Sequence, residues 1–280
     1  MHAGISDSSP EAERFQIVLF RQASAGRKIA LVRSLSTTII ELSRRNRSPR
    51  SITVELGLPL PPSTPLAPLT PEEIEVKTPP DLITALIPLT DLFDSWGVDY
   101  FIGGSIASSA HGIPRATTDI DLVAALTEDL VKPLGEKLSK SYSIEEAAVR
   151  RAVANLGSFN VIHLATMLKL DIFVRGSGEY EIEEARRAAR IPFDDALEGR
   201  QFPVASAEDM IIVKLDWFRS GGEVSERQWS DITGLIKVRA QTLDWDYLWR
   251  WTGRKGTHHL LAKAVTETGP IPSDPPEEWA

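Results

Sequence analysis

The sequence contains no cysteine. Disulfide bonds, thiolate metal sites and cysteine nucleophiles are therefore all excluded, and the absence suits a cytoplasmic protein. No apolar run approaches the roughly 20 residues that cross a bilayer, so we expect no membrane association. The N-terminus also lacks the basic, apolar and small-residue pattern of a signal peptide.

Two common catalytic signatures are also missing. No G-x-x-x-x-G-K-[ST] loop is present, which argues against a P-loop NTPase. No Gly-X-Ser-X-Gly elbow accompanies the serines near His111, which argues against a Ser–His hydrolase. The neighbouring His258 and His259 lack a third ligand at metal-binding spacing.

Charge is spread unevenly along the chain. The net charge of the 280 residues is −8, yet residues 1–60 carry nine Lys/Arg against five Asp/Glu. The acidic remainder argues against wrapping by nucleic acid, whereas the basic N-terminal part leaves a local phosphate contact open. Charge alone does not decide the function.

One stretch, Tyr100 to Val123, concentrates the chemistry. Its aromatic and β-branched start at 100–102 predicts a short strand. Gly103 and Gly104 end that strand in a sharp turn, and Ser105 is expected to cap the short helix that follows. Strict polar/apolar alternation then predicts a second strand from Asp119 to Val123.

Side chains alternate between the faces of a strand, so Asp119 and Asp121 share one face. Two neighbouring carboxylates repel each other unless a cation or a proton separates them, and Mg²⁺ is commonly bound by one or two carboxylates plus substrate phosphates. Free N–H groups in the Gly-Gly-Ser turn would attract those phosphates. The combination predicts a nucleotide site. The alternative is a Gly-rich turn beside two solvated aspartates.

Three further residues are weaker candidates. Asp171 lies in the expected strand 168–175, where it faces away from the core. Lys214 is the only charge among the apolar residues 210–215, so it either reaches solvent or meets an anion. Arg115 precedes Asp119 and could contact a phosphate or brace the loop.

The order Gly-Gly-Ser, thirteen residues, Asp-Ile-Asp resembles the signature of the DNA polymerase beta-like nucleotidyltransferase superfamily. The segment 112–122 looks most like its AbiEii-type, abortive-infection toxin branch, and Lys169-Leu170-Asp171 resembles the Lys-X-Asp motif of that branch. The resemblance implies Mg²⁺, or Mn²⁺, held by Asp119, Asp121 and Asp171. The nucleotide-binding residues it implies are Gly103, Gly104, Ser105, Arg115, Lys169, Lys214 and Asp231. For Asp231, a surface pair with Arg227 is nearly as well supported.

By this resemblance the chain would transfer a nucleoside monophosphate from an NTP such as ATP to an acceptor hydroxyl. The acceptor would be RNA, for example a tRNA 3′ end, or a protein, and the enzyme would be a toxin of a toxin–antitoxin or phage-defence system with an antitoxin partner. The basic cluster 44–50 and the aromatic cluster 245–251 could contact RNA, although such aromatics are more often core. A small-molecule, antibiotic-type nucleotidyltransferase and a non-catalytic nucleotide-binding protein remain alternatives.

We expect an α/β fold with a small, mixed, twisted sheet. Residues 1–58 read as a helical hairpin and 59–80, with eight prolines, as a linker. The catalytic core would span 81–200, a helical subdomain 201–269 and a tail 270–280. A chain starting near residue 78 is then expected to fold alone.

Overall fold

The computed structural model describes the residues in the ranges 17–18, 20–46, 81–117, 119–166, 168–193 and 200–269. Its helices are α2 (Ala25–Asn46), α5 (Asp81–Trp96), α6 (Gly104–His111), α7 (Glu128–Leu138), α8 (Glu146–Asn155), α9 (Glu179–Arg187), α10 (Ala207–Ser220), α11 (Glu226–Arg239), α12 (Trp245–Lys255) and α13 (His258–Thr268). Its strands are β1 (Tyr100–Ile102), β2 (Asp119–Ala124), β3 (Tyr142–Ser143), β4 (Ser158–His163), β5 (Lys169–Val174), β6 (Ala189–Pro192) and β7 (Gln201–Val204).

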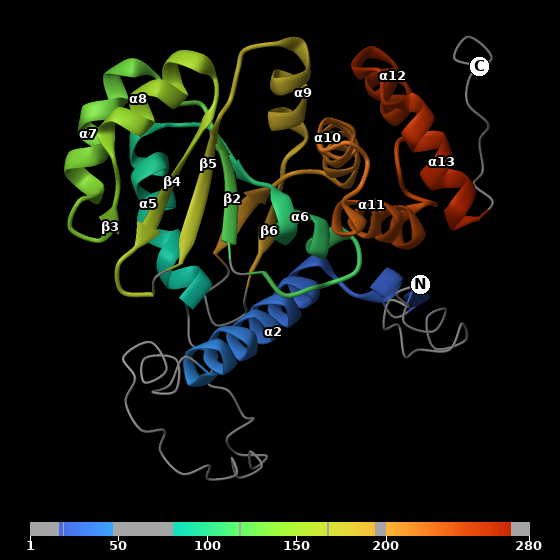
Figure 1. Ribbon diagram of the computed structural model, residues 1–280, viewed down its shortest axis with the longest axis horizontal. Coiled ribbons are helices and arrows are strands. Elements are labelled where there is room, and N and C mark those ends of the chain that lie inside the picture. The colour runs from blue at the N-terminus through green and yellow to red at the C-terminus, as the bar shows by residue number, and fades with distance from the viewer. Residues whose placement is uncertain are drawn as a thin grey trace, which may run out of the picture.

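The strands form one seven-stranded sheet in the order β3-β4-β5-β2-β1-β7-β6. The pairs β2–β5 and β1–β7 are parallel, and the other pairs are antiparallel. The predicted α/β class with a mixed sheet is therefore confirmed. In Figure 1 the helices α10 to α13 gather on one side of the sheet, and α2 crosses beneath it.

Three strands were not expected from the sequence. The charged composition of residues 178–190 predicts one helix, but α9 ends at Arg187 and β6 begins at Ala189. β6 pairs with β7, which joins β1, so the sheet continues to Val204. The boundary expected at 200/201 therefore lies next to a sheet strand, and the helical subdomain begins only after it. The third, β3, is a two-residue edge strand of a length that pattern reading does not detect.

The two faces of the sheet differ because alternate residues point to opposite sides. Ile120, Leu122, Leu170 and Ile172 are fully buried. Their face is covered by α5, where Phe93 packs on Tyr100 with ring centroids 5.7 Å apart. Pro88 lies inside α5, which continues without interruption to Trp96. The opposite face carries the aspartates.

Helix α2 belongs to the same core as the sheet. Ser24 caps it as expected, accepting a hydrogen bond from the Arg27 N–H at 3.2 Å. Its Ile29 is only 1% exposed and packs in the main hydrophobic cluster, and Lys28 Nζ donates to the His111 carbonyl at 3.0 Å. Helix α2 is therefore part of the main core, and the expectation that a chain starting near residue 78 folds alone stays a prediction. The linker 59–80 lies outside the described residues.

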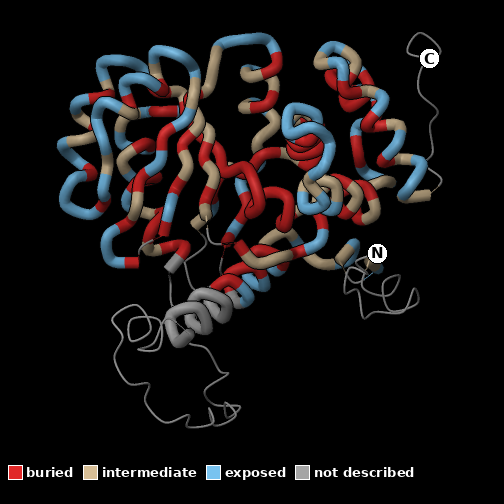
Figure 2. The backbone as a smooth tube through the Cα atoms, in the orientation of Figure 1, coloured by how far each residue is buried: buried red, intermediate tan, exposed pale blue. Residues whose placement is uncertain are grey.

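The C-terminal helices are fixed by local caps and by burial. Ser206 and Ser225 accept N-cap hydrogen bonds from the Asp209 and Gln228 amides. Figure 2 shows buried residues concentrated in the strands and on the inward sides of these helices. Within the ranges that the structure describes, no helix has the length and apolarity to span a membrane.

Candidate active site

The register of the sheet aligns the candidate residues in rows. Asp121 on β2 pairs with Asp171 on β5, which pairs in turn with Asn160 on β4. The Gly103 N–H donates to the Asp121 carbonyl at 2.9 Å, which places the glycine turn at the other end of this row. Residues directly opposite in a sheet share a face, so both carboxylates and the Asn160 amide lie side by side. Asn160 is not predictable from the sequence, since an exposed strand asparagine carries no signal without the register.

Asp119 lies one row further along the same face, opposite Lys169. The Thr117 hydroxyl donates to Asp119 Oδ1 at 2.6 Å. The Thr117 N–H donates in turn to the Ser36 hydroxyl of α2 at 2.9 Å, and both residues are buried. Helix α2 therefore helps to orient a carboxylate that is 83 positions further along the chain than Ser36.

The electrostatics of Asp121 show an excess of negative charge. Its pKa is raised to about 6 by burial first, and then by repulsion from Asp119 and Asp171. The Ser105 backbone N–H donates to this carboxylate and offsets part of the rise. A cation at this position would remove the repulsion, so the environment of Asp121 suits a metal ion.

Asp171 is paired in the structure with Lys169, whose ammonium lies 2.6 Å from Asp171 Oδ2. The hydrogen bond to Asp171 raises the pKa of Lys169. Burial lowers that pKa, but the negative charges of the three aspartates add to the rise and outweigh the burial. Across the described ranges no cluster of three or more His, Cys, Asp or Glu is arranged to hold a metal ion. Two carboxylates completed by substrate phosphates still fit Mg²⁺, because that ion rarely uses an all-protein cage. The three-aspartate metal set stays a prediction.

The glycine turn approaches Asp121 closely. Gly104 has φ +55°, and a Cβ there would lie 1.7 Å from Asp121 Oδ2. Only glycine fits this position, because it tolerates left-handed backbone and has no side chain. The helix begins at Gly104 with Gly103 as its N-cap, so the expected capping role of Ser105 is wrong. Ser105 lies inside the first turn, and its side chain serves another purpose.

The Ser105 hydroxyl accepts a hydrogen bond from Arg115 Nη2 at 2.6 Å. Arg115 also donates two hydrogen bonds to the Asp231 carboxylate of α11, at 2.8 and 2.9 Å. Lys214 of α10 donates to the same carboxylate at 2.8 Å and to Gln228 at 3.0 Å. The structure thus joins four predicted nucleotide-binding residues in one network, with Gln228 as an addition, and the alternative pairing of Asp231 with Arg227 is not formed.

This network has one cation more than it has anions. Burial lowers the pKa of Lys214, opposed by the Asp231 carboxylate. Burial would raise the pKa of Asp231, but the hydrogen bonds from Arg115 and Lys214 outweigh it and hold that pKa below its ordinary value. Both cations therefore share one carboxylate beside the start of α6, where backbone amides already favour an anion. Lys214 is 2% exposed, so its direct phosphate contact stays a prediction.

A cavity of about 310 Å³ adjoins the aspartate face. Its floor includes Gly103, Asp121, Val123 and Phe173, and α10 supplies Trp217, whose ring centroid lies 5.7 Å from that of Phe173. Trp217 is 39% exposed, so its ring is accessible. This aromatic pair was not predicted from the sequence, although Trp217 follows Lys214 by about one helical turn. The cavity offers a flat, apolar surface next to the carboxylates.

Helix α9 forms another wall of this cavity with Glu181 and Glu184. Glu184 is 8% exposed. Burial, with repulsion from Asp209 as the next cause, raises its pKa to about 8. No sequence pattern singles out this carboxyl, because its burial arises from packing on the C-terminal helices.

The aromatic cluster 245–251 is core. Trp245, Trp249 and Trp251 are between 4% and 9% exposed, and the Trp251 indole donates to Glu183 at 3.0 Å. The prediction that this cluster stacks on RNA bases is therefore wrong. The side chains of the basic cluster 44–50 lie outside those that the structure describes.

Comparisons with known proteins give structural neighbours only. No protein-family model and no curated protein matches the chain. The crystal structure of lincosamide antibiotic adenylyltransferase LnuA with bound lincomycin aligns at 18% identity and TM-score 0.38, covering 57% of this chain and 98% of that one. The solution structure of the antibiotic-resistance factor ANT(2'')-Ia aligns at 15% identity and TM-score 0.40, covering 67% of this chain and 98% of that one. The crystal structure of an antigenic nucleotidyltransferase-like protein from Paracoccidioides brasiliensis aligns at 17% identity and TM-score 0.39, covering 67% of this chain and 93% of that one.

These identities and TM-scores are low. The case for a function rests on the site.

Proposed function

We propose that this chain is a nucleotidyltransferase that moves a nucleoside monophosphate from an NTP to an acceptor hydroxyl. The observation that carries the proposal is the row across the sheet, which sets the glycine turn, Asp121 and Asp171 side by side. A phosphate-binding turn and paired carboxylates are the two parts that metal-assisted transfer at phosphorus requires.

The nucleotide would bind with its phosphates at the start of α6. The amides at the start of α6 that are not bonded to Asp121, together with the net positive charge of the Arg115–Asp231–Lys214 network, favour a polyanion there. The nucleobase would occupy the neighbouring cavity against Phe173 and Trp217, since an aromatic surface stacks on a base of any sequence.

Asp119 and Asp121 would hold Mg²⁺ or Mn²⁺, with the phosphates as further ligands. When bound, the ion supplies charge neutralisation for the reacting phosphates. Asp171 would accept the proton of the acceptor hydroxyl once Lys169 releases it. The acceptor oxygen then bonds to the α-phosphorus, the bond to the bridging oxygen breaks, and pyrophosphate leaves with the electron pair.

For the acceptor we propose RNA, with a toxin role and an antitoxin partner as the motif resemblance suggests. A small hydroxylated amine is the second candidate, because Glu181 and Asp216 add carboxylates to the cavity beside Asp121. A protein acceptor is a further outcome of the same experiment.

The test follows label from each α-³²P NTP with Mg²⁺ into the RNA, protein and small-molecule fractions of a cell lysate. Label in RNA that disappears in the Asp119→Ala variant supports the proposal. Label confined to small molecules assigns the second candidate. No label in any fraction, with the protein folded, contradicts the proposed transfer and favours a non-catalytic protein.

A further inference from the structure

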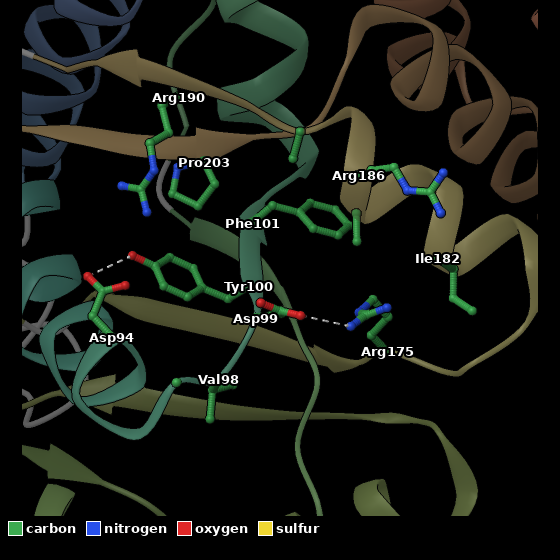
Figure 3. Close-up of a pocket in the computed structure, with 13 residues that line it drawn as sticks. Asp94, Val98, Asp99, Tyr100, Phe101, Arg175, Ile182, Arg186, Arg190 and Pro203 are labelled. Atoms are coloured by element: carbon green, nitrogen blue, oxygen red, sulfur yellow. Dashed lines mark hydrogen bonds and ion pairs between the residues drawn. The ribbon is translucent and has the colours of Figure 1, made fainter.

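A second cavity, of about 660 Å³, lies on the other side of α9 from the aspartate face. Helix α9 turns Glu181 and Glu184 toward the first cavity, and Ile182 and Arg186 toward the second. The floor of the second cavity is formed by the start of β1, by Arg190 of β6 and by Pro203 of β7 (Figure 3). The two cavities are thus separated by a single helix.

Three guanidinium groups line this second cavity, which we call the arginine cavity: Arg175, Arg186 and Arg190. Figure 3 shows them arranged around the Phe101 ring, with Arg190 on one side and the other two opposite. They come from three different elements, the end of β5, α9 and β6. Each guanidinium is a planar fork that suits phosphate oxygens.

These arginines have spare donors. Arg175 is 13% exposed and pairs with Asp99 only at 3.7 Å, and its Nε has no hydrogen-bond partner. Arg186 makes no ion pair within the described ranges, and Arg190 makes one long hydrogen bond to the Gln201 carbonyl, at 3.4 Å.

The acidic residues of the cavity offset this charge weakly. Asp99 is 83% exposed, and ion pairs in solvent contribute little. Asp94 is the other carboxylate, and it accepts a hydrogen bond from the Tyr100 hydroxyl at 3.5 Å. A buried donor without an acceptor is costly, so an anion in the cavity would be bound favourably.

The arginine cavity is connected to the candidate active site through two residues. Phe101 and Arg175 line both cavities. Arg175 directly follows the end of β5, four residues after Asp171, which is about 13 Å at the usual strand rise. An extended ligand with its hydroxyl at Asp171 would therefore pass Arg175 before it reaches Arg186 and Arg190.

We propose that the arginine cavity binds the phosphodiester backbone of a single-stranded RNA acceptor, next to the nucleotide whose hydroxyl is modified. This inference rests on the proposed nucleotidyl transfer to RNA and adds the site that binds the acceptor. The arginines hold the backbone phosphates, Phe101 lies between them as an apolar contact, and the amine-bearing small acceptor has no use for the site.

The experiment titrates a fluorescently labelled 12-nucleotide single-stranded RNA with the full chain and measures anisotropy at several salt concentrations. The test variant is Arg186→Ala with Arg190→Ala. The control removes the same charge from exposed positions of α7 and α8, by Lys132→Ala with Arg151→Ala. Thermal unfolding checks that both variants are folded.

We expect the test pair to weaken RNA binding at least tenfold and to reduce the slope of log K against log salt by about 1.4, for two lost phosphate contacts. The control pair should stay within twofold of the wild type, and Mg-ATP binding should be unchanged in both. Absence of RNA binding by the wild type, or equal weakening by the two pairs, overturns the proposal.

Two further measurements separate the possible failures. Titrations with pyrophosphate and with ATP test whether the arginine cavity binds the phosphates of the nucleotide substrate instead. If the test pair loses binding of pyrophosphate or ATP but keeps RNA binding, the RNA assignment is overturned. The Asp119→Ala variant should retain RNA binding. RNA binding that depends on the arginines, in a chain that transfers no nucleotide, would remove the proposed function and leave the binding site.

Discussion

Asp121 of β2 and Asp171 of β5 are register partners in parallel strands, so their carboxylates face the same side of the sheet from neighbouring strands. They come from positions 50 residues apart in the chain. Burial and mutual repulsion raise the pKa of Asp121 to about 6, with Asp119 contributing to the same effect. This arrangement costs folding energy in the absence of a cation, as functional sites often do.

The first prediction concerns that cost. An acid whose pKa is raised on folding binds more protons in the folded state, so stability falls as pH rises from about 4 to about 6. Asp121→Asn should remove this dependence and raise the free energy of unfolding at pH 8 by up to about 3 kcal/mol, while transfer activity is lost. Denaturant unfolding at a series of pH values measures the free energy of unfolding of the wild type and of the variant.

Asp246→Asn, at an exposed position of α12, is the control and should change neither quantity. A destabilised Asp121→Asn variant would show that the carboxylate serves the fold.

The second prediction concerns the glycine turn. Gly104→Ala places a methyl group on the Asp121 carboxylate and forces a left-handed alanine. The variant should lose at least about 2 kcal/mol of stability, and Mg-NTP binding should be undetectable by calorimetry.

Gly103→Ala is the matched control, since no heavy atom lies within 4 Å of the added Cβ and the backbone φ is −113°. Near-normal Mg-NTP binding by Gly104→Ala would disprove the close approach of turn and carboxylate.

The third prediction concerns the chain of contacts from Ser36 through Thr117 to Asp119. Thr117→Val removes the hydrogen bond to Asp119 Oδ1, and loss of such an outer contact typically weakens a metal site 10- to 100-fold. Mn²⁺ binding, followed by the EPR signal of the free ion with a non-hydrolysable NTP present, should weaken by at least about tenfold.

Thr117→Ser keeps the hydroxyl and should restore binding. Ser36→Ala, which leaves the Thr117 N–H without its acceptor, should weaken it in the same direction. Unchanged Mn²⁺ affinity in Thr117→Val would mean that this hydrogen bond does not orient the carboxylate.

The fourth prediction concerns α2. Ile29 is 1% exposed in the main core, whereas Leu31 on the same helix is 41% exposed. Ile29→Ala should cost about 2–5 kcal/mol, and Leu31→Ala should stay within about 0.5 kcal/mol of the wild type. Chemical denaturation compares them directly, and equal effects would show that α2 is not packed against the sheet in solution.

Part of the site follows from the sequence because its rules are local. The strand period of two puts Asp119 and Asp121 on one face. Ser24, Ser206 and Ser225 mark helix starts because a hydroxyl satisfies a free amide three residues on. Ser105 failed as a cap because the glycine before it already adopts the turn.

Other parts depend on which strands become neighbours. Two hydrogen-bonded residues cannot be identified from either strand alone, so Asn160 could not be placed beside Asp171 by alternation. The edge strand β3 and the hairpin of β6 and β7 were missed for the related reason that short strands are stabilised by their partners.

The sequence by itself determined the mixed α/β class, the glycine turn and the shared face of the aspartate pair, because each depends on backbone preferences over a few residues. Only the tertiary structure decided the alignment of Gly103, Asp121, Asp171 and Asn160 across neighbouring strands. It also decided the salt bridge from Arg115 to Asp231, 116 positions away, and the packing of α2 in the core. These contacts join distant segments. Their formation depends on burial and pairing in three dimensions, which no local pattern encodes.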